Sequence, residues 1–76
     1  MDNILITLKM PNLSALDLKI PAHISGTELL KMLTEITGNS IPAESKIQAE
    51  PLGRILDNSQ TLYAEGVGHG ALLTLL

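Results

Sequence analysis

The N-terminal segment alternates between apolar and polar side chains, as a half-buried β-strand does. Apolar residues recur at every second position on both sides of a turn: Ile4, Ile6, Leu8 and Met10, then Leu16, Leu18 and Ile20. Pro11-Asn12-Leu13-Ser14 supplies the turn chemistry between the two series, and Pro21 closes the second one. The pattern therefore predicts a β-hairpin over residues 3–20 with one apolar face.

A helix start follows the hairpin. Ser25 and Glu28 have the spacing of a capping box, in which the serine hydroxyl accepts the Glu28 N–H and the Glu28 carboxylate accepts the Ser25 N–H. Gly38-Asn39 provides a stop signal. Between them, apolar residues recur at helical spacing: Leu29, Met32, Leu33 and Ile36. We expect one helix, residues 26–37, whose apolar stripe packs on the sheet.

Strand patterns and turns make up the second half. They follow in this order: Ile47 to Ala49 alternating with polar neighbours, the turn Pro51-Leu52-Gly53, the short segment Arg54-Ile55-Leu56, a single helical turn from Thr61 to Gly66, and a closing strand from Gly70 to Leu76. The predicted order is β-β-α-β-β-β. We expect an α+β fold, with a mixed sheet packed on one helix in a single domain spanning residues 1–76.

Composition narrows the class of protein. A chain of 76 residues suits one small core, and aliphatic residues supply almost all of its 45% hydrophobic content. The absence of cysteine excludes disulfides and thiolate metal sites, and it fits a reducing compartment. Neither a secretory signal nor an unbroken apolar span is visible. We therefore expect a cytoplasmic protein without direct membrane insertion.

The charge pattern argues against a nucleic-acid-binding function. The formal net charge is -3, and Tyr63 is the single aromatic residue. The basic residues are scattered along the chain: Lys9, Lys19, Lys31, Lys46 and Arg54. Nucleic-acid binding needs clustered cations, ideally with aromatic stacking platforms. We expect no nucleic-acid partner.

Candidate chemical sites have simpler structural interpretations. Gly66-Val67-Gly68-His69-Gly70 contains the glycines of a phosphate loop, but an apolar strand follows it where such a loop needs a helix N-terminus. His23 and His69 have no cysteine to join them in a metal site, so we expect exposed loop histidines. No nucleophile, base and orienting group are brought together by the pattern. We expect no catalytic, cofactor-binding or metal-binding residues.

The element order and several local motifs resemble ubiquitin over essentially the whole chain. Three further motifs stand out: Asp17-Leu18-Lys19-Ile20-Pro21-Ala22 before a leucine-rich helix, Gly53-Arg54-Ile55-Leu56 with Thr61-Leu62, and Gly70-Ala71-Leu72-Leu73-Thr74-Leu75-Leu76 at the end. In these motifs the chain is still more similar to the bacterial YukD/EsaB family of ubiquitin-like proteins associated with type VII (Ess/ESX-like) secretion. The resemblance implies a ubiquitin-like β-grasp fold and a cytosolic accessory or regulatory role in secretion, without a reaction.

Three functional classes remain open. The first is a non-conjugating interaction module whose protein partner is a component of the secretion machinery. The second is a generic ubiquitin-like adaptor. The third, a protein tag or sulfur carrier, needs a flexible Gly-Gly tail, whereas we expect the strand ending in Leu75-Leu76 to be held in the sheet. The sequence does not determine the partner, the oligomeric state or the direction of any regulation.

A binding face can be proposed from the resemblance. In a β-grasp sheet the first and last strands lie parallel at the centre, so alternate residues of both point away from the helix. We expect the candidate partner-binding face to consist of these residues: Leu5, Thr7, Lys9, Leu72, Thr74 and Leu76. Its leucines would form an exposed apolar patch, and such patches on small monomers tend to mark interaction sites.

Overall fold

The computed structural model describes residues 3–11, 14–38, 41–42 and 44–76, and this part of the chain forms five strands and one helix. Their bounds, in chain order, are β1 Asn3–Lys9, β2 Leu16–Pro21, α1 Gly26–Thr37, β3 Ile47–Glu50, β4 Arg54–Ile55 and β5 Ala71–Leu75. The expected turn residues Asn12 and Leu13, and Asn39 of the helix stop, lie outside the described residues.

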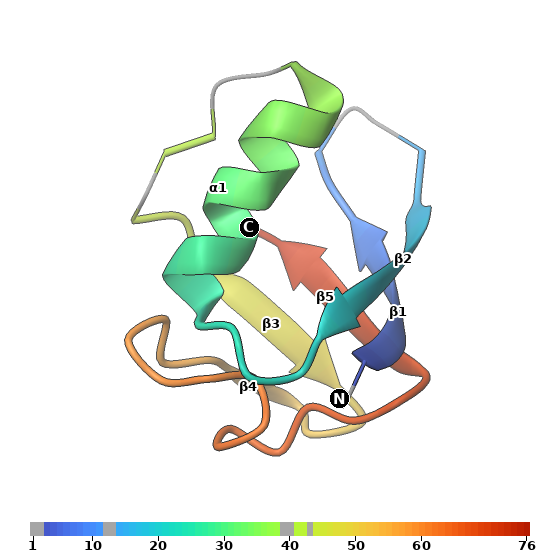
Figure 1. Ribbon diagram of the computed structural model, residues 1–76, viewed down its shortest axis with the longest axis vertical. Helices are drawn as coiled ribbons and strands as arrows, with labels where there is room; N and C mark the ends of the chain where they lie inside the picture. The colour runs from blue at the N-terminus through green and yellow to red at the C-terminus, as the bar shows by residue number, and fades with distance from the viewer. Residues whose placement is uncertain (1–2, 12–13, 39–40, 43) are drawn as a thin grey trace.

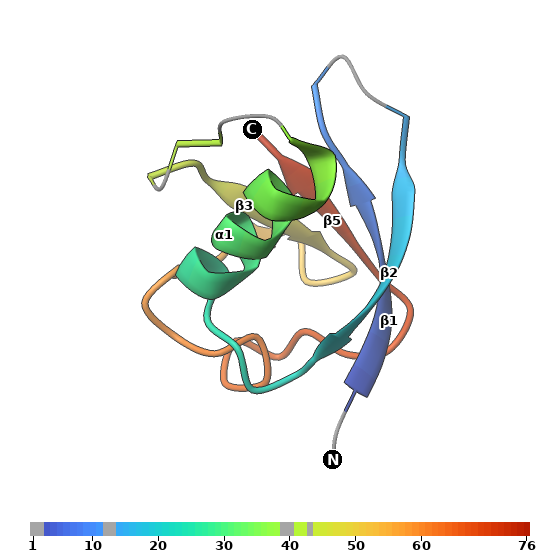
Figure 2. The same ribbon diagram turned by 45° about the horizontal axis from the view of Figure 1, so that its top comes forward.

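The strands form one mixed sheet in the order β2-β1-β5-β3-β4 (Figure 1). β1 and β2 pair antiparallel, whereas β5 lies parallel to β1. β3 pairs antiparallel with both β5 and β4. Figure 2 shows α1 crossing one face of this sheet. The predicted β-grasp order is confirmed, including the adjacent parallel placement of the first and last strands.

The helix begins and ends where the local sequence signals predict. The Glu28 N–H donates to Ser25 Oγ, and the Ser25 N–H donates to Glu28 Oε1, both at 3.1 Å. At the other end Gly38 has a φ of 72° and donates its N–H to the Thr34 carbonyl. Such a left-handed cap favours glycine because it has no Cβ. The capping box and the Gly38 stop are therefore confirmed.

The helix face that packs on the sheet differs from the predicted stripe. Leu29 and Leu33 are fully buried, as expected, but Ile36 is 54% exposed. Leu30, which the stripe left out, is only 1% exposed, and Met32 is half-buried. Successive helical residues are about 100° apart, so a buried arc that contains Leu29, Leu30 and Leu33 leaves Ile36 at its border. The expectation that Ile36 packs against the sheet is wrong.

Burial alternates along the two central strands. The side chains that point toward α1 are buried: Ile4, Ile6 and Leu8 on β1, and Ala71, Leu73 and Leu75 on β5. They join Leu33 of α1 and Ile47 of β3 in one aliphatic core. The intervening residues of β1 and β5 therefore face the opposite side of the sheet, as the period of two requires.

The closing strand is held in the sheet up to the last residue of the chain. Leu75 lies opposite Ile47, and the Leu76 N–H donates to the Lys46 carbonyl at 2.9 Å. Before this strand, the Glu65 N–H donates to the Thr61 carbonyl, which closes a single turn. Both features agree with the sequence-based expectation.

Candidate partner-binding face

The side of the sheet away from α1, here called the outer face, carries the residues proposed from the sequence. The parallel register aligns Thr7 with Leu72 and Lys9 with Thr74. Leu5 precedes Thr7 by two residues, so it lies diagonally across from Leu72 on the same face. The pairing of β1 with β5 is therefore what brings Leu5 and Leu72 together.

The outer face is less continuous in its apolar character than the sequence suggests. Leu5 is 47% exposed and Leu76 is 58% exposed, whereas Leu72 is half-buried. Leu76 follows Leu72 by four residues, a distance of about 13 Å along a strand, with Thr74 between them. The structure thus groups Leu5 with Leu72 and places Leu76 apart, at the other end of the face.

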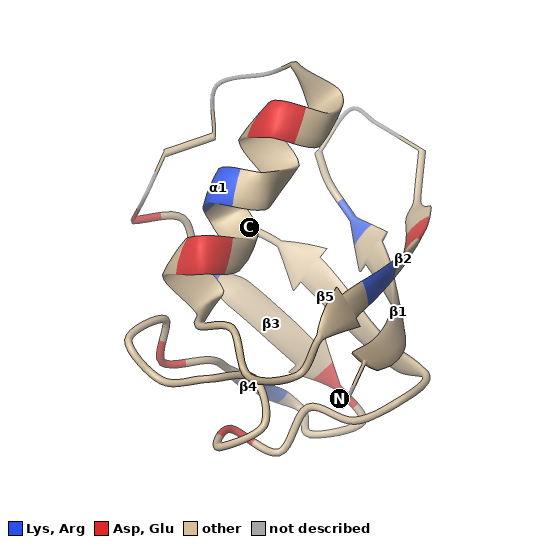
Figure 3. Cartoon of the chain, in the orientation of Figure 1, with Lys and Arg blue, Asp and Glu red and all other residues tan. Residues whose placement is uncertain are grey.

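Polar side chains surround the pair formed by Leu5 and Leu72. Thr7 and Glu50 flank Leu72, and Lys19 lies opposite Leu5. Thr7 Oγ1 donates to Asp17 Oδ1 at 2.8 Å, which fixes part of this border. Acidic and basic residues are interspersed over the molecule (Figure 3). A small apolar centre with a polar border is the arrangement found in protein–protein interfaces.

His69 has a structural contact that sequence reasoning missed. Its Nδ1 accepts the backbone N–H of Leu5 at 3.2 Å, and the neighbouring Gly70 donates its N–H to the Leu5 carbonyl at 2.7 Å. Both bonds continue the pairing of β1 and β5 beyond its first register pair, Ile6 with Ala71. His69 therefore helps to hold Leu5 in place beside the start of β5. Both histidines are exposed, as expected.

The glycine-rich loop before β5 serves as a turn. Gly66 and Gly70 have φ values of 87° and 86°, which a side chain would strain. Val67 between them is buried in the core, and the extended strand β5 begins at Ala71. The loop therefore lacks the helix N-terminus that a phosphate site of this kind uses.

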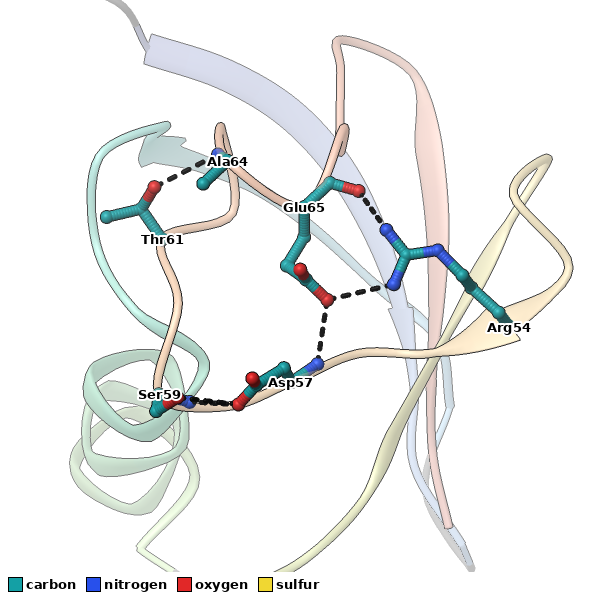
Figure 4. Close-up of polar contacts among 6 residues, drawn as sticks. All are labelled: Arg54, Asp57, Ser59, Thr61, Ala64 and Glu65. Atoms are coloured by element: carbon teal, nitrogen blue, oxygen red, sulfur yellow. Dashed lines mark hydrogen bonds and ion pairs between the residues drawn. The ribbon is translucent and has the colours of Figure 1, made fainter.

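A polar cluster holds the loop that precedes β5 (Figure 4). Arg54 donates through Nη1 to Glu65 Oε1 at 2.9 Å and through Nη2 to the Glu65 carbonyl at 2.6 Å. Glu65 Oε1 also accepts the Asp57 N–H at 2.8 Å. The Asp57 N–H has the larger effect and the Arg54 guanidinium the next, and both hold the pKa of the Glu65 carboxyl below its ordinary value. Hydrogen bonds from Ser59 lower the pKa of the Asp57 carboxyl in the same way.

This cluster serves to shape the loop. Arg54 is the residue next to the β3–β4 turn, and Glu65 ends the turn that begins at Thr61. The Arg54 contacts therefore join β4 to the segment that leads into β5.

Tyr63 projects from the turn that begins at Thr61. It is 64% exposed, and its ring centroid lies 5.1 Å from that of His23.

The described part of the chain brings no three His, Cys, Asp or Glu side chains into a metal-binding group. Its helix is also too short and too polar to cross a membrane. The Ser25 hydroxyl, the one serine singled out by the sequence pattern, accepts the Glu28 N–H in the capping box. The outer face is therefore the strongest candidate site.

Comparison with known proteins identifies a family. The family described as "WXG100 protein secretion system (Wss), protein YukD" matches residues 4–75 of this chain, which is nearly its whole length. Among curated proteins no significant match is found.

Solved structures confirm the fold. The ubiquitin-like domain of an Arabidopsis thaliana protein has a TM-score of 0.81 at 14% identity, with 100% of this chain and 78% of that one covered. A protein designed on the basis of ubiquitin gives 0.77 at 24% identity, covering 97% and 87%. A ubiquitin from Caldiarchaeum subterraneum gives 0.73 at 18% identity, covering 97% and 91%. At these identities the similarity establishes the fold alone.

Proposed function

Because the chain belongs to the YukD family of the WXG100 protein secretion system, we propose that it is a non-enzymatic interaction module of such a system. It acts on the cytoplasmic side, and its partner is a protein component of the secretion machinery. The docking surface is the outer face around Leu5 and Leu72.

The observation that carries this proposal is the grouping of Leu5 and Leu72 inside a polar border. Leu5 is nearly half exposed although it lies on a central strand, and Leu72 is flanked by Thr7 and Glu50. Covering two leucines with a partner removes apolar surface from water, and the surrounding polar groups can select the partner by charge and hydrogen bonding. A centre of this size suits a small interface and transient docking.

The test uses cells that lack this chain and depend on it for export of a WXG100 protein. The double variant Leu5→Glu with Leu72→Glu should lose most of the export that the wild-type chain restores. Each carboxylate would be desolvated in the interface without a partner. Both residues lie on the outer face, so circular dichroism should show an intact fold.

A control variant separates the face from general effects. Tyr63→Gln removes an exposed ring from the Thr61–Gly66 turn and leaves the outer face unchanged. We expect it to restore export fully. A folded double variant that supports export as well as wild type would reject the Leu5 and Leu72 surface as the docking site.

A further inference from the structure

β2 forms an open edge of the sheet. Its neighbour is β1, and no other strand of the described sheet lies beyond it. An edge strand presents backbone N–H and C=O groups that can pair with another strand. The opposite edge is β4, which is only two residues long, whereas β2 has six residues from Leu16 to Pro21. β2 is therefore the edge that could accept a further strand.

The apolar layer is incomplete at this same edge. Leu16 and Leu18 point toward the helix layer, since they lie opposite Leu8 and Ile6, yet both are only half-buried. Met32 and the exposed Ile36 lie on the flank of α1 away from Ile41. Figures 1 and 2 show β2 on that side of the helix. An added strand would cover the inner side chains that β2 leaves open.

The charged residues of β2 indicate which strand pairs with this edge. Asp17 and Lys19 flank Leu18, and both are exposed on the outer face. We propose that β2 pairs antiparallel with β2 of a second copy of this chain, with Leu18 on the two-fold axis. Asp17 then lies opposite Lys19 of the second copy, and the symmetry repeats this pair on the other side of the axis.

The same charges exclude the neighbouring registers. An axis at Asp17 would place two carboxylates opposite each other, and an axis at Lys19 would oppose two ammonium groups, which destabilises cross-strand pairs. A shift of the pairing register by one residue would reverse one copy relative to the other, so that the leucines of one copy lie on the same side as the outer face of the other. In the proposed register, Leu16 meets Ile20 of the second copy on the helix side. Asp17 Oδ1 accepts the Thr7 hydroxyl, which leaves the other carboxylate oxygen for the ion pair.

The dimer joins the two sheets into one continuous sheet with both helices on the same side. Its two outer faces then also lie on one side, so a partner could meet two copies of the Leu5 surface at once. The dimer does not depend on the proposed function. The contact consists of one strand pair and a few side chains, so we expect a weak dimer that forms as concentration rises.

Sedimentation equilibrium between micromolar and millimolar concentration tests the proposal. The wild-type mass should rise from 8.1 kDa toward twice that value. Asp17→Lys and Lys19→Asp each place like charges opposite each other on both sides of the two-fold axis. Each should weaken the dimer by about tenfold or more. The double variant with both changes restores opposite charges and should dimerise as wild type does.

A mixture of the two single variants gives the sharpest result. Asp17→Lys makes both positions basic and Lys19→Asp makes both acidic, so the two chains should form a heterodimer although each alone stays monomeric. Lys19→Asp also retains the bond from Thr7 to Asp17. A monomeric wild type at millimolar concentration, or single variants that dimerise as well as wild type, would overturn the proposal.

A measurement on the wild-type chain covers the case in which a variant does not fold. Amide NMR signals should shift with concentration at Leu16 to Ile20 and near Ile36, and should stay constant in β4. Shifts that map to another surface would overturn the proposed pairing of β2 with β2 of a second copy.

Discussion

His69 Nδ1 accepts a hydrogen bond from the backbone N–H of Leu5 at 3.2 Å, although 64 positions separate the two residues in the chain. This bond ties the loop before β5 to the centre of β1. The bond thereby holds Leu5 beside the start of β5, close to Leu72. His69 is therefore a positioning residue for the outer face.

Replacing His69 should loosen that end of the sheet. His69→Ala removes the acceptor from an exposed site, so we expect a loss of about 0.5–1.5 kcal/mol in the free energy of unfolding. Hydrogen exchange of the Leu5 amide should accelerate. His23→Ala serves as the control because His23 contacts the Tyr63 ring, whereas the acceptor of the Leu5 N–H is His69. Unchanged Leu5 exchange in His69→Ala would show that the bond does not form in solution.

The core assignment on α1 can be tested with a matched pair of variants. Leu33 is fully buried, so Leu33→Ala should lower the free energy of unfolding by about 2–5 kcal/mol through lost burial and a cavity. Ile36→Ala should cost much less because the Ile36 side chain is already half exposed. Urea denaturation measures both. Equal losses for the two variants would contradict the finding that Leu33 is buried against the sheet and Ile36 is exposed.

The sequence predicts those parts of the fold that depend on near neighbours. The Ser25–Glu28 capping box and the alternation along β1 are local patterns, so both are recovered. The exchange of Ile36 for Leu30 in the buried face is not recoverable in this way, since it depends on how the helix sits on strands far away in the chain.

Long-range polar contacts set a similar limit on predicting the site. Alternation and strand order place Leu5 and Leu72 on one face. The bond from Leu5 to His69 and the contact between Arg54 and Glu65 each join a strand to a loop that no local pattern connects to it. The spacing between Leu72 and Leu76 could have shown in advance that Thr74 separates them.

Gly26 is a position where a single methyl group should be harmful. It is buried at the first turn of α1, and an added Cβ would lie 2.6 Å from Asn58 Oδ1 and 2.9 Å from Asn58 Cα. Gly26→Ala should therefore destabilise the fold by about 1–3 kcal/mol through overpacking, despite the helix propensity of alanine.

Gly68→Ala is the control, because nothing lies within 4 Å of a Cβ there and its φ is not positive. It should be neutral or slightly stabilising. Thermal melts that rank Gly26→Ala above Gly68→Ala would contradict the close packing of Asn58 against the helix start.

The polar cluster around Glu65 predicts a dependence of stability on pH. The pKa of the Glu65 carboxyl is lower in the folded chain than its ordinary value. Its stabilising effect is therefore complete above that ordinary value and disappears as the pH falls through the folded pKa. Glu65→Gln should be less stable than wild type at neutral pH, and the difference should shrink in acid. A difference that is constant from neutral to strongly acidic pH would show that the carboxylate charge has no role.

The central claim is that the chain docks on the secretion machinery through the outer face. Amide NMR spectra of the labelled chain, recorded while the cytoplasmic parts of that machinery are added one at a time, test it most directly. We predict that one of them shifts or broadens the signals of Leu5, Thr7 and Leu72, while those of the Leu30 side of α1 stay in place. Binding that perturbs α1 or the β2 edge and leaves Leu5 and Leu72 unchanged would contradict the account.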